Sequence, residues 1–184
     1  MKARISLSAA VTLSIVMAVP SLGAVAGANS SPALVLRGDG LALARIGARE
    51  AAVQSALVKR LGSPTKAISS TPALENCGVT AMASWRALSA YFNRGRLVGL
   101  SIGPGTTPSV VTSLGLRLGD TVRVARSLYG KALRLSESQG GAWFVKTSDG
   151  RLDGFLRPSN GRPEPTSRIL TLDVGDVGCP AMSP

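Results

Sequence analysis

Residues 85–102 read WRALSAYFNRGRLVGLSI, and this stretch decides the expected fold. Its first half alternates with a period of two, with one face formed by Trp85, Ala87, Ser89 and Tyr91 and the other by Leu88, Ala90 and Phe92. Asn93-Arg94-Gly95 supplies a turn, because glycine adopts positive φ at little cost, and Arg96 to Ile102 returns. The stretch therefore predicts a β-hairpin.

A second hairpin is expected over residues 142–156. Ala142 to Thr147 rises, Ser148-Asp149-Gly150 turns, and Arg151 to Leu156 returns. The returning strands resemble each other, since GRLVGL at 95–100 matches GRLDGF at 150–155. The sequence therefore predicts one unit that is repeated once; chance similarity in a chain rich in Gly, Leu and Arg is the alternative.

An amphipathic helix is expected before each hairpin. The first runs from Ala51 to Leu61 and ends at Gly62, and the second runs from Val122 to Tyr129 and ends at Gly130. A glycine-led apolar segment precedes each helix, at 40–43 and at 115–118, and is expected to be a strand.

Together these patterns predict an α+β fold: two helix-plus-β-hairpin repeats sharing an antiparallel sheet, with one disulfide. Residues 34–179 would form the single domain, with repeat one at about 34–102 and repeat two at about 110–179. The last strand is expected over Arg168–Val174. Residues 29–33 and 180–184 are expected to be a flexible N-terminus and a tail.

The first 28 residues have the layout of a secretory signal peptide. Lys2 and Arg4 give a basic start, an acid-free apolar run follows from Ile5 to Val19, and Ala26-Gly27-Ala28 supplies the small residues of a cleavage site. The run is short of the roughly 20 residues that span a bilayer, so no transmembrane span is expected after cleavage; an uncleaved anchor is the alternative. The protein is expected to be secreted, either extracellular or associated with the cell wall.

Basic residues outnumber acidic ones. The chain has 21 Lys and Arg against 10 Asp and Glu, and loss of Lys2 and Arg4 with the signal peptide would leave a net charge of +9. Such a charge favours polyanions, namely anionic lipids and acidic wall polymers, although nothing indicates sequence-specific nucleic-acid binding. A charge that merely keeps the protein soluble is the alternative.

Histidine is absent, which removes the commonest general base and the commonest metal ligand. Cys77 and Cys179 both lie in the exported part, where an even number of cysteines predicts a disulfide; two free thiols or a redox pair are the alternative.

No motif identifies an enzyme. Ser63-Pro64-Thr65-Lys66 matches the S-x-x-K motif of serine β-lactamases, but it follows a helix end and lacks the partner motifs. Asp149 with Asp153, or Asp173 with Asp176, offers too few oxygen ligands for calcium. No catalytic residue, metal site or cofactor is therefore expected.

Six of the seven aromatic residues of the expected mature chain lie on the two hairpins. Exposed aromatic side chains with neighbouring arginines would make a protein-binding surface, and burial of all of them in the core is the alternative. The candidate binding residues are Trp85, Arg86, Tyr91, Arg96, Trp143 and Arg151.

The order of these features resembles secreted actinobacterial proteins of unknown role that are built like the β-lactamase-inhibitor protein and the small lipoproteins of outer-membrane assembly. The resemblance is carried by GRLVGL at 95–100, by GLRLGDT at 115–121, by LYG at 128–130 and by the terminal Gly178-Cys179. It implies short helices packed on antiparallel strands, duplicated in the inhibitor. The inhibitor has a disulfide within each repeat, whereas Cys77 and Cys179 would bridge the two repeats, and no inhibitory contact residue carries over.

The leading hypothesis is a secreted, non-enzymatic binding module whose partner is an extracellular protein or an envelope component. The alternative is a basic envelope-associated protein that binds anionic polymers or lipids.

Overall fold

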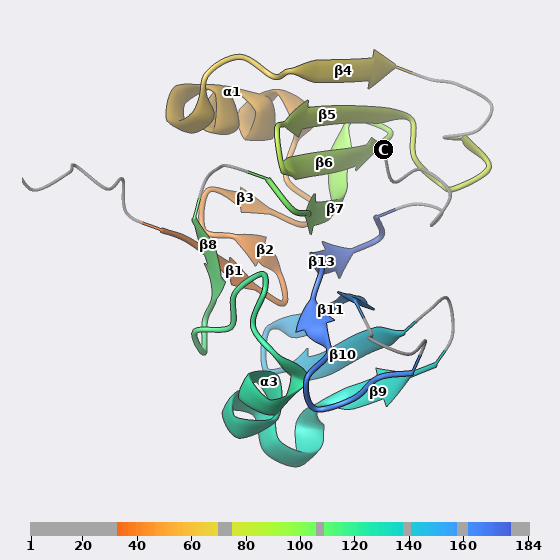
Figure 1. Ribbon diagram of the computed structural model, residues 1–184. Helices are drawn as coiled ribbons and strands as arrows, with labels where there is room; N and C mark the ends of the chain where they lie inside the picture. The colour runs from red at the N-terminus through yellow and green to blue at the C-terminus, as the bar shows by residue number, and fades with distance from the viewer. Residues whose placement is uncertain (1–32, 70–74, 106–108, 138–140, 158–161, 178–184) are drawn as a thin grey trace, which may run out of the picture. The chain divides into compact units, whose positions relative to one another are not determined.

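The computed structural model describes residues 33–69, 75–105, 109–137, 141–157 and 162–177 (Figure 1). The expected signal peptide, the flexible N-terminus up to residue 32 and the tail lie outside these ranges. None of the described helices is long and apolar enough to cross a membrane.

Strands are the main regular structure of the described chain, and they are arranged in two sheets. The smaller sheet has the order β3-β2-β1-β8 and the larger has β4-β5-β6-β7-β13-β11-β10-β9, with β12 paired to β11. The strands of the smaller sheet are β1 (Leu34–Arg37), β2 (Gly40–Leu41), β3 (Ala44–Arg45) and β8 (Val110–Thr112). Those of the larger sheet are β4 (Lys66–Ser69), β5 (Ala81–Trp85), β6 (Leu88–Asn93), β7 (Arg96–Ile102), β9 (Arg134–Ser136), β10 (Ala142–Thr147), β11 (Gly150–Arg157), β12 (Arg168–Ile169) and β13 (Leu172–Gly175).

Two α-helices form where the sequence predicts them. Helix α1 spans Glu50–Leu61 and α3 spans Val122–Tyr129, followed by the short 3₁₀ helix η1 (Gly130–Ala132). The Thr121 hydroxyl oxygen accepts a hydrogen bond from the Val124 N–H (3.4 Å), so that α3 begins with a side-chain cap. Both helices end at a glycine with positive φ, as expected for a chain that must leave the helical path.

The expected fold class is wrong. The two hairpins form, as β6–β7 and β10–β11, and both lie in the larger sheet, but the protein is mostly β and has a second, smaller sheet. The first half supplies β1, β2 and β3 to the smaller sheet, and the second half supplies only β8, which pairs parallel to β1. The parallel pair between residues 34–36 and 110–112 joins distant parts of the chain. The local alternation of apolar and polar residues therefore does not predict it.

Two expected strands also change. Residues 115–118 form no strand, because a turn at 113–114 brings Leu116 back to Thr112. The Thr112 N–H donates to Leu116 O (2.9 Å), and the Leu116 N–H donates to Thr112 Oγ1 (3.0 Å). The expected strand over Arg168–Val174 is split into β12 and β13, because the N–H groups of Leu170 and Thr171 both turn toward Phe155 O. Strand β13 then pairs antiparallel with both β7 and β11 and so joins the two hairpins.

The expected Cys77–Cys179 disulfide falls outside the described residues, because Cys179 is not among them.

One large hydrophobic core lies between the sheets and helices. It takes Leu36 from the smaller sheet, Val53 and Leu57 from α1, and Ala125 and Tyr129 from α3. It also takes one face of the larger sheet, which we call the core face, along Trp85, Leu88, Phe92, Leu97, Leu100, Ile102, Trp143, Val145, Leu152, Leu172 and Val174. The opposite face of the larger sheet, which we call the outer face, carries the side chains between these residues.

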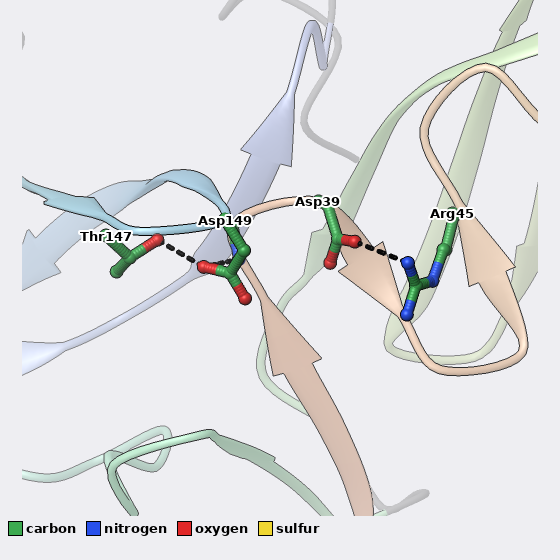
Figure 2. A network of polar contacts seen from close by, with 5 residues as sticks. Asp39, Arg45, Thr147 and Asp149 are labelled. Atoms are coloured by element: carbon green, nitrogen blue, oxygen red, sulfur yellow. Dashed lines mark hydrogen bonds and ion pairs between the residues drawn. The ribbon is translucent and has the colours of Figure 1, made fainter.

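A polar network fixes the turn between β1 and β2 against the turn between β10 and β11 (Figure 2). The Thr147 hydroxyl donates to Asp149 Oδ1 (2.6 Å), and the same oxygen accepts the Gly38 N–H (3.4 Å). Asp39, on the other side of Gly38, pairs with Arg45 (3.1 Å). Hydrogen bonding from Thr147 lowers the pKa of Asp149, so this carboxylate is charged at neutral pH.

The same two turns approach so closely that only glycine fits. A Cβ on Gly150 would lie 2.2 Å from Gly38 O, and Gly150 has a φ of 142°, a value that L-residues rarely adopt. We expect Gly150→Ala to destabilise the protein by about 2–4 kcal/mol, from the steric clash together with the backbone strain. Urea unfolding followed by circular dichroism measures the loss.

Gly103→Ala is the matched control for this prediction, because a Cβ at Gly103 meets nothing within 4 Å. It should change the free energy of unfolding by less than about 1 kcal/mol. Equal behaviour of the two variants would show that the turns do not meet as described.

Candidate functional site

The outer face of the larger sheet carries one row of aligned side chains that crosses all eight strands of its main path. Direct pairing across each pair of neighbouring strands defines the row as Lys66, Ser84, Ser89, Ser101, Asp173, Asp153, Phe144 and Arg134. Residues directly opposite each other in an antiparallel pair point to the same face, with Cβ atoms roughly 5 Å apart. The strand pairing therefore brings one side chain from each of these eight strands into one line.

Two carboxylates meet in the middle of this row. Asp173 on β13 stands directly opposite Asp153 on β11. Asp173 is 3% exposed, and it accepts hydrogen bonds from the Ser101 hydroxyl (2.6 Å) and the Thr171 hydroxyl (2.7 Å). Asp153 is half-buried and pairs with Arg151 (2.9 Å).

Burial dominates the protonation of both carboxyls. Burial raises the pKa of Asp173 to about 6, the hydrogen bonds from Ser101 and Thr171 oppose the rise, and the charge of Asp153 adds to it. Burial also raises the pKa of Asp153, while Arg151 pulls it back. At neutral pH two negative charges therefore lie close together, in a setting that disfavours both.

A pocket of about 320 Å³ lies over these carboxylates. Its lining comes from β9, β10, β11, β13 and the residues after β13, and includes Ser136, Phe144, Arg151, Asp153, Phe155 and Asp173. The Arg151 guanidinium lies over the Phe144 ring, 4.5 Å from its centroid, and pairs with Asp153 at the same time. The pocket thus combines apolar walls with a negatively charged floor.

The rest of the outer face is partly covered. Val79, Met82 and Tyr91 form a second, small apolar cluster, against which Ile68, Val98 and Val177 pack. Tyr91 is 8% exposed, and its burial together with the charge of Asp173 raises the pKa of its phenol.

The structure separates the six residues that the sequence predicts as a binding surface. Trp85 and Trp143 are core residues, 3% and 1% exposed, so the prediction that they face a partner is wrong. Their indole N–H groups donate to Gly62 O (2.9 Å) and Thr171 O (3.3 Å). Each tryptophan is therefore both packed and hydrogen-bonded.

The other four residues lie in four places. Tyr91 lies in the small apolar cluster, Arg151 at the pocket, and Arg86 in the turn between β5 and β6, with a φ of 56°. Arg96 lies at the start of β7, where its guanidinium donates to Gly47 O (2.8 Å). Of these four residues only Arg151 lines the pocket described above, and of the two tryptophans Trp143 also lines it.

The carboxylate pairs that the sequence suggests differ from the pair in the structure. Asp149 with Asp153 and Asp173 with Asp176 are near each other along the chain, whereas the structure pairs Asp153 with Asp173. The sequence feature that could have indicated this pair is that Asp153 and Asp173 each lie on a strand between apolar neighbours. The register that joins them depends on β13 pairing with β11, which no local pattern reveals. In the described ranges no group of three His, Cys, Asp or Glu side chains could hold a metal ion.

These observations define a mostly β protein with a candidate binding pocket on the outer face of its larger sheet. No family model matches the chain, and no curated protein matches it. Among solved structures, the chain is similar to the uncharacterized protein YfeY from Escherichia coli, at 10% identity and a TM-score of 0.46, over 77% of this chain and 99% of that chain.

Proposed function

We propose that this protein is a secreted binding module that holds a cationic segment of an extracellular protein partner against the outer face of its larger sheet. The observation that carries the proposal is the facing pair Asp153 and Asp173 at the floor of an apolar-walled pocket. A buried carboxylate pair weakens a fold unless a positive group approaches it, and carboxyls perturbed in this way concentrate at functional sites.

The pocket suits an arginine or lysine side chain with an apolar neighbour. Asp173 has no ion pair among the described residues, whereas Asp153 already holds Arg151. A partner's guanidinium or ammonium would neutralise Asp173, and an adjacent apolar side chain would pack on Phe144 and Phe155. The charge of Asp173 would therefore favour binding of a basic segment over an acidic one, even though the chain as a whole carries a net positive charge.

The test uses two synthetic peptides as probes, one alternating Arg with Tyr and one alternating Glu with Tyr. Backbone NMR of the purified protein in about 150 mM salt, which screens the net charge, should show the basic peptide shifting amides of β10, β11 and β13. Asp153→Asn should weaken its binding about tenfold through loss of one charge contact. The control Asp39→Asn removes a carboxylate that pairs with Arg45 outside the pocket, and it should leave the affinity unchanged.

Two results would contradict the proposal. One is equal binding of the acidic and basic peptides, since the pocket would then offer no charge selection. The other is an equal loss of affinity in the Asp153→Asn and Asp39→Asn proteins, because the effect would then come from overall charge.

A further inference from the structure

Three arginines from two distant segments line a second groove. Arg49 precedes α1, and Arg94 and Arg96 flank Gly95 in the turn between β6 and β7. The groove has a volume of about 550 Å³, and all three arginines are exposed. It lies apart from the pocket on the outer face, with which it shares no lining residue.

The backbone beneath these arginines is firmly held. The Glu50 N–H donates to Gly95 O (2.8 Å), the Gly47 N–H to Leu97 O (2.7 Å), and the Leu97 N–H to Ala48 O (2.9 Å). The Arg96 guanidinium is itself tied to Gly47 O. The groove is therefore built on fixed main chain, which lowers the entropic cost of binding a ligand.

Two features of the groove destabilise the free protein, so a purely structural role does not explain them. Arg49 and Arg96 are directly opposed as an isolated antiparallel bridge, and like charges in that arrangement repel each other. Arg94 has a φ of 47° and the following Gly95 a φ of 71°, the geometry of a two-residue turn in which Asn-Gly is the favoured pair. An arginine at this position strains the backbone while placing its charge at the groove.

The local charge is positive. Glu50 is the acid of the groove, and its Oε1 accepts a hydrogen bond from Gln54 Nε2 (2.9 Å). Within the ranges that the structure describes, none of the three arginines forms an ion pair with an acidic side chain. Their guanidinium groups present planar donors that match the oxygens of a phosphate group.

We propose that the groove of Arg49, Arg94 and Arg96 binds phosphate groups. An oxyanion between Arg49 and Arg96 would remove their mutual repulsion, and Arg94 would close the third side. The open groove admits a phosphate that belongs to a larger molecule, either a lipid headgroup or a phosphate polymer.

The experiment measures binding of fluorescent polyphosphate to the purified protein at several salt concentrations. Arg94→Asn should weaken polyphosphate binding about tenfold, yet raise the melting temperature by a few degrees, because Asn suits the turn better than Arg. The matched control Arg117→Asn removes the same charge from an exposed position outside the groove, and it should weaken binding no more than twofold. Opposite movement of stability and affinity separates a binding role from a folding defect.

Two further arms identify the source of the phosphate. Competition by inorganic phosphate at millimolar concentration supports recognition of the phosphate group itself. Binding to vesicles with 30% phosphatidylglycerol, weakened by Arg94→Asn, supports a lipid source; binding to polyphosphate alone supports a polymer. Equal losses in Arg94→Asn and Arg117→Asn, or wild-type protein that binds neither probe, would overturn the proposal.

Discussion

Replacing Asp173 by asparagine should make the protein more stable at pH 8 and leave its stability at pH 4 nearly unchanged. Asparagine keeps an oxygen that accepts the Ser101 hydrogen bond and an amide near Thr171, but it carries no charge to be buried. The gain at pH 8 should be on the order of 2–3 kcal/mol, because each unit of pKa shift corresponds to about 1.4 kcal/mol.

The sign of the pH dependence follows from the direction of the shift. The folded protein keeps the Asp173 proton up to a pKa of about 6, whereas the unfolded chain releases it near 3.8. The folded state therefore binds more protons between these values, and stability falls as the pH rises through this window, then levels off. Asp153, whose pKa is also raised, acts in the same direction. Asp149, whose pKa is lowered, destabilises the fold only below about 3.8, outside this window.

Urea unfolding of both proteins at pH 4, 5, 6, 7 and 8 measures this effect. The wild-type midpoint should decrease from pH 4 to pH 7, and the Asp173→Asn midpoint should decrease much less, with Asp153 supplying the slope that remains. Asp39→Asn, altered outside the pocket, should keep the wild-type slope. A wild-type midpoint that does not change between pH 5 and pH 8 would mean that Asp173 is solvated, and the pocket floor would not be as described.

Burial of a carboxylate pair links stability to the proposed binding. A ligand cation that neutralises Asp173 would lower the pKa of this carboxyl, so ligand binding should release protons between pH 5 and pH 7. The pH at which the protein holds its partner would then be set by the same two side chains that weaken the free fold. Stability and affinity are therefore expected to change in opposite directions on Asp173→Asn.

Local features of the fold were predictable from the sequence. Hairpin β10–β11 and helix α3 are where they are expected, because alternation, a turn glycine, a threonine cap and a closing glycine all act within a few residues. The smaller sheet was not predictable, because its parallel β1–β8 pair joins residues 76 positions apart, such as Leu34 and Val110. The same holds for β13, whose two neighbours are strands of different halves of the chain.

The error about the tryptophans has a local cause. Sequence reasoning continued one alternation from Trp85 to Phe92, which placed Trp85 on the face of Tyr91. In the structure a turn at Arg86 and Ala87 separates β5 from β6, and Trp85 pairs directly with Leu88. The turn resets the alternation, so Trp85 shares the core face with Leu88 and Phe92 while Tyr91 faces outward. Arg86 has a φ of 56°, which arginine rarely adopts, so the residue type did not indicate a turn here.

The second large effect is expected from Trp143→Ala, which should destabilise the protein by about 3–5 kcal/mol. Trp143 is 1% exposed on the core face and stands directly opposite Gly154 on β11. A Cβ on Gly154 would lie 2.8 Å from Trp143 Nε1, so the indole occupies the space that a side chain at residue 154 would need. Truncation to alanine would open a cavity and leave Thr171 O without the indole N–H.

Circular dichroism in urea is the suitable measurement, because removing one of two tryptophans changes the fluorescence baseline. Phe144→Ala is the control: Phe144 is the next residue on the same strand, half-buried on the outer face, and its loss should cost about 1–2 kcal/mol while weakening binding of the basic peptide. A domain with a total stability of about 5–15 kcal/mol tolerates the second change better than the first. The opposite result would be a smaller loss of unfolding free energy in Trp143→Ala than in Phe144→Ala, together with loss of peptide binding in Trp143→Ala. Trp143 would then lie on a binding surface, and the assignment of core and outer faces would be reversed.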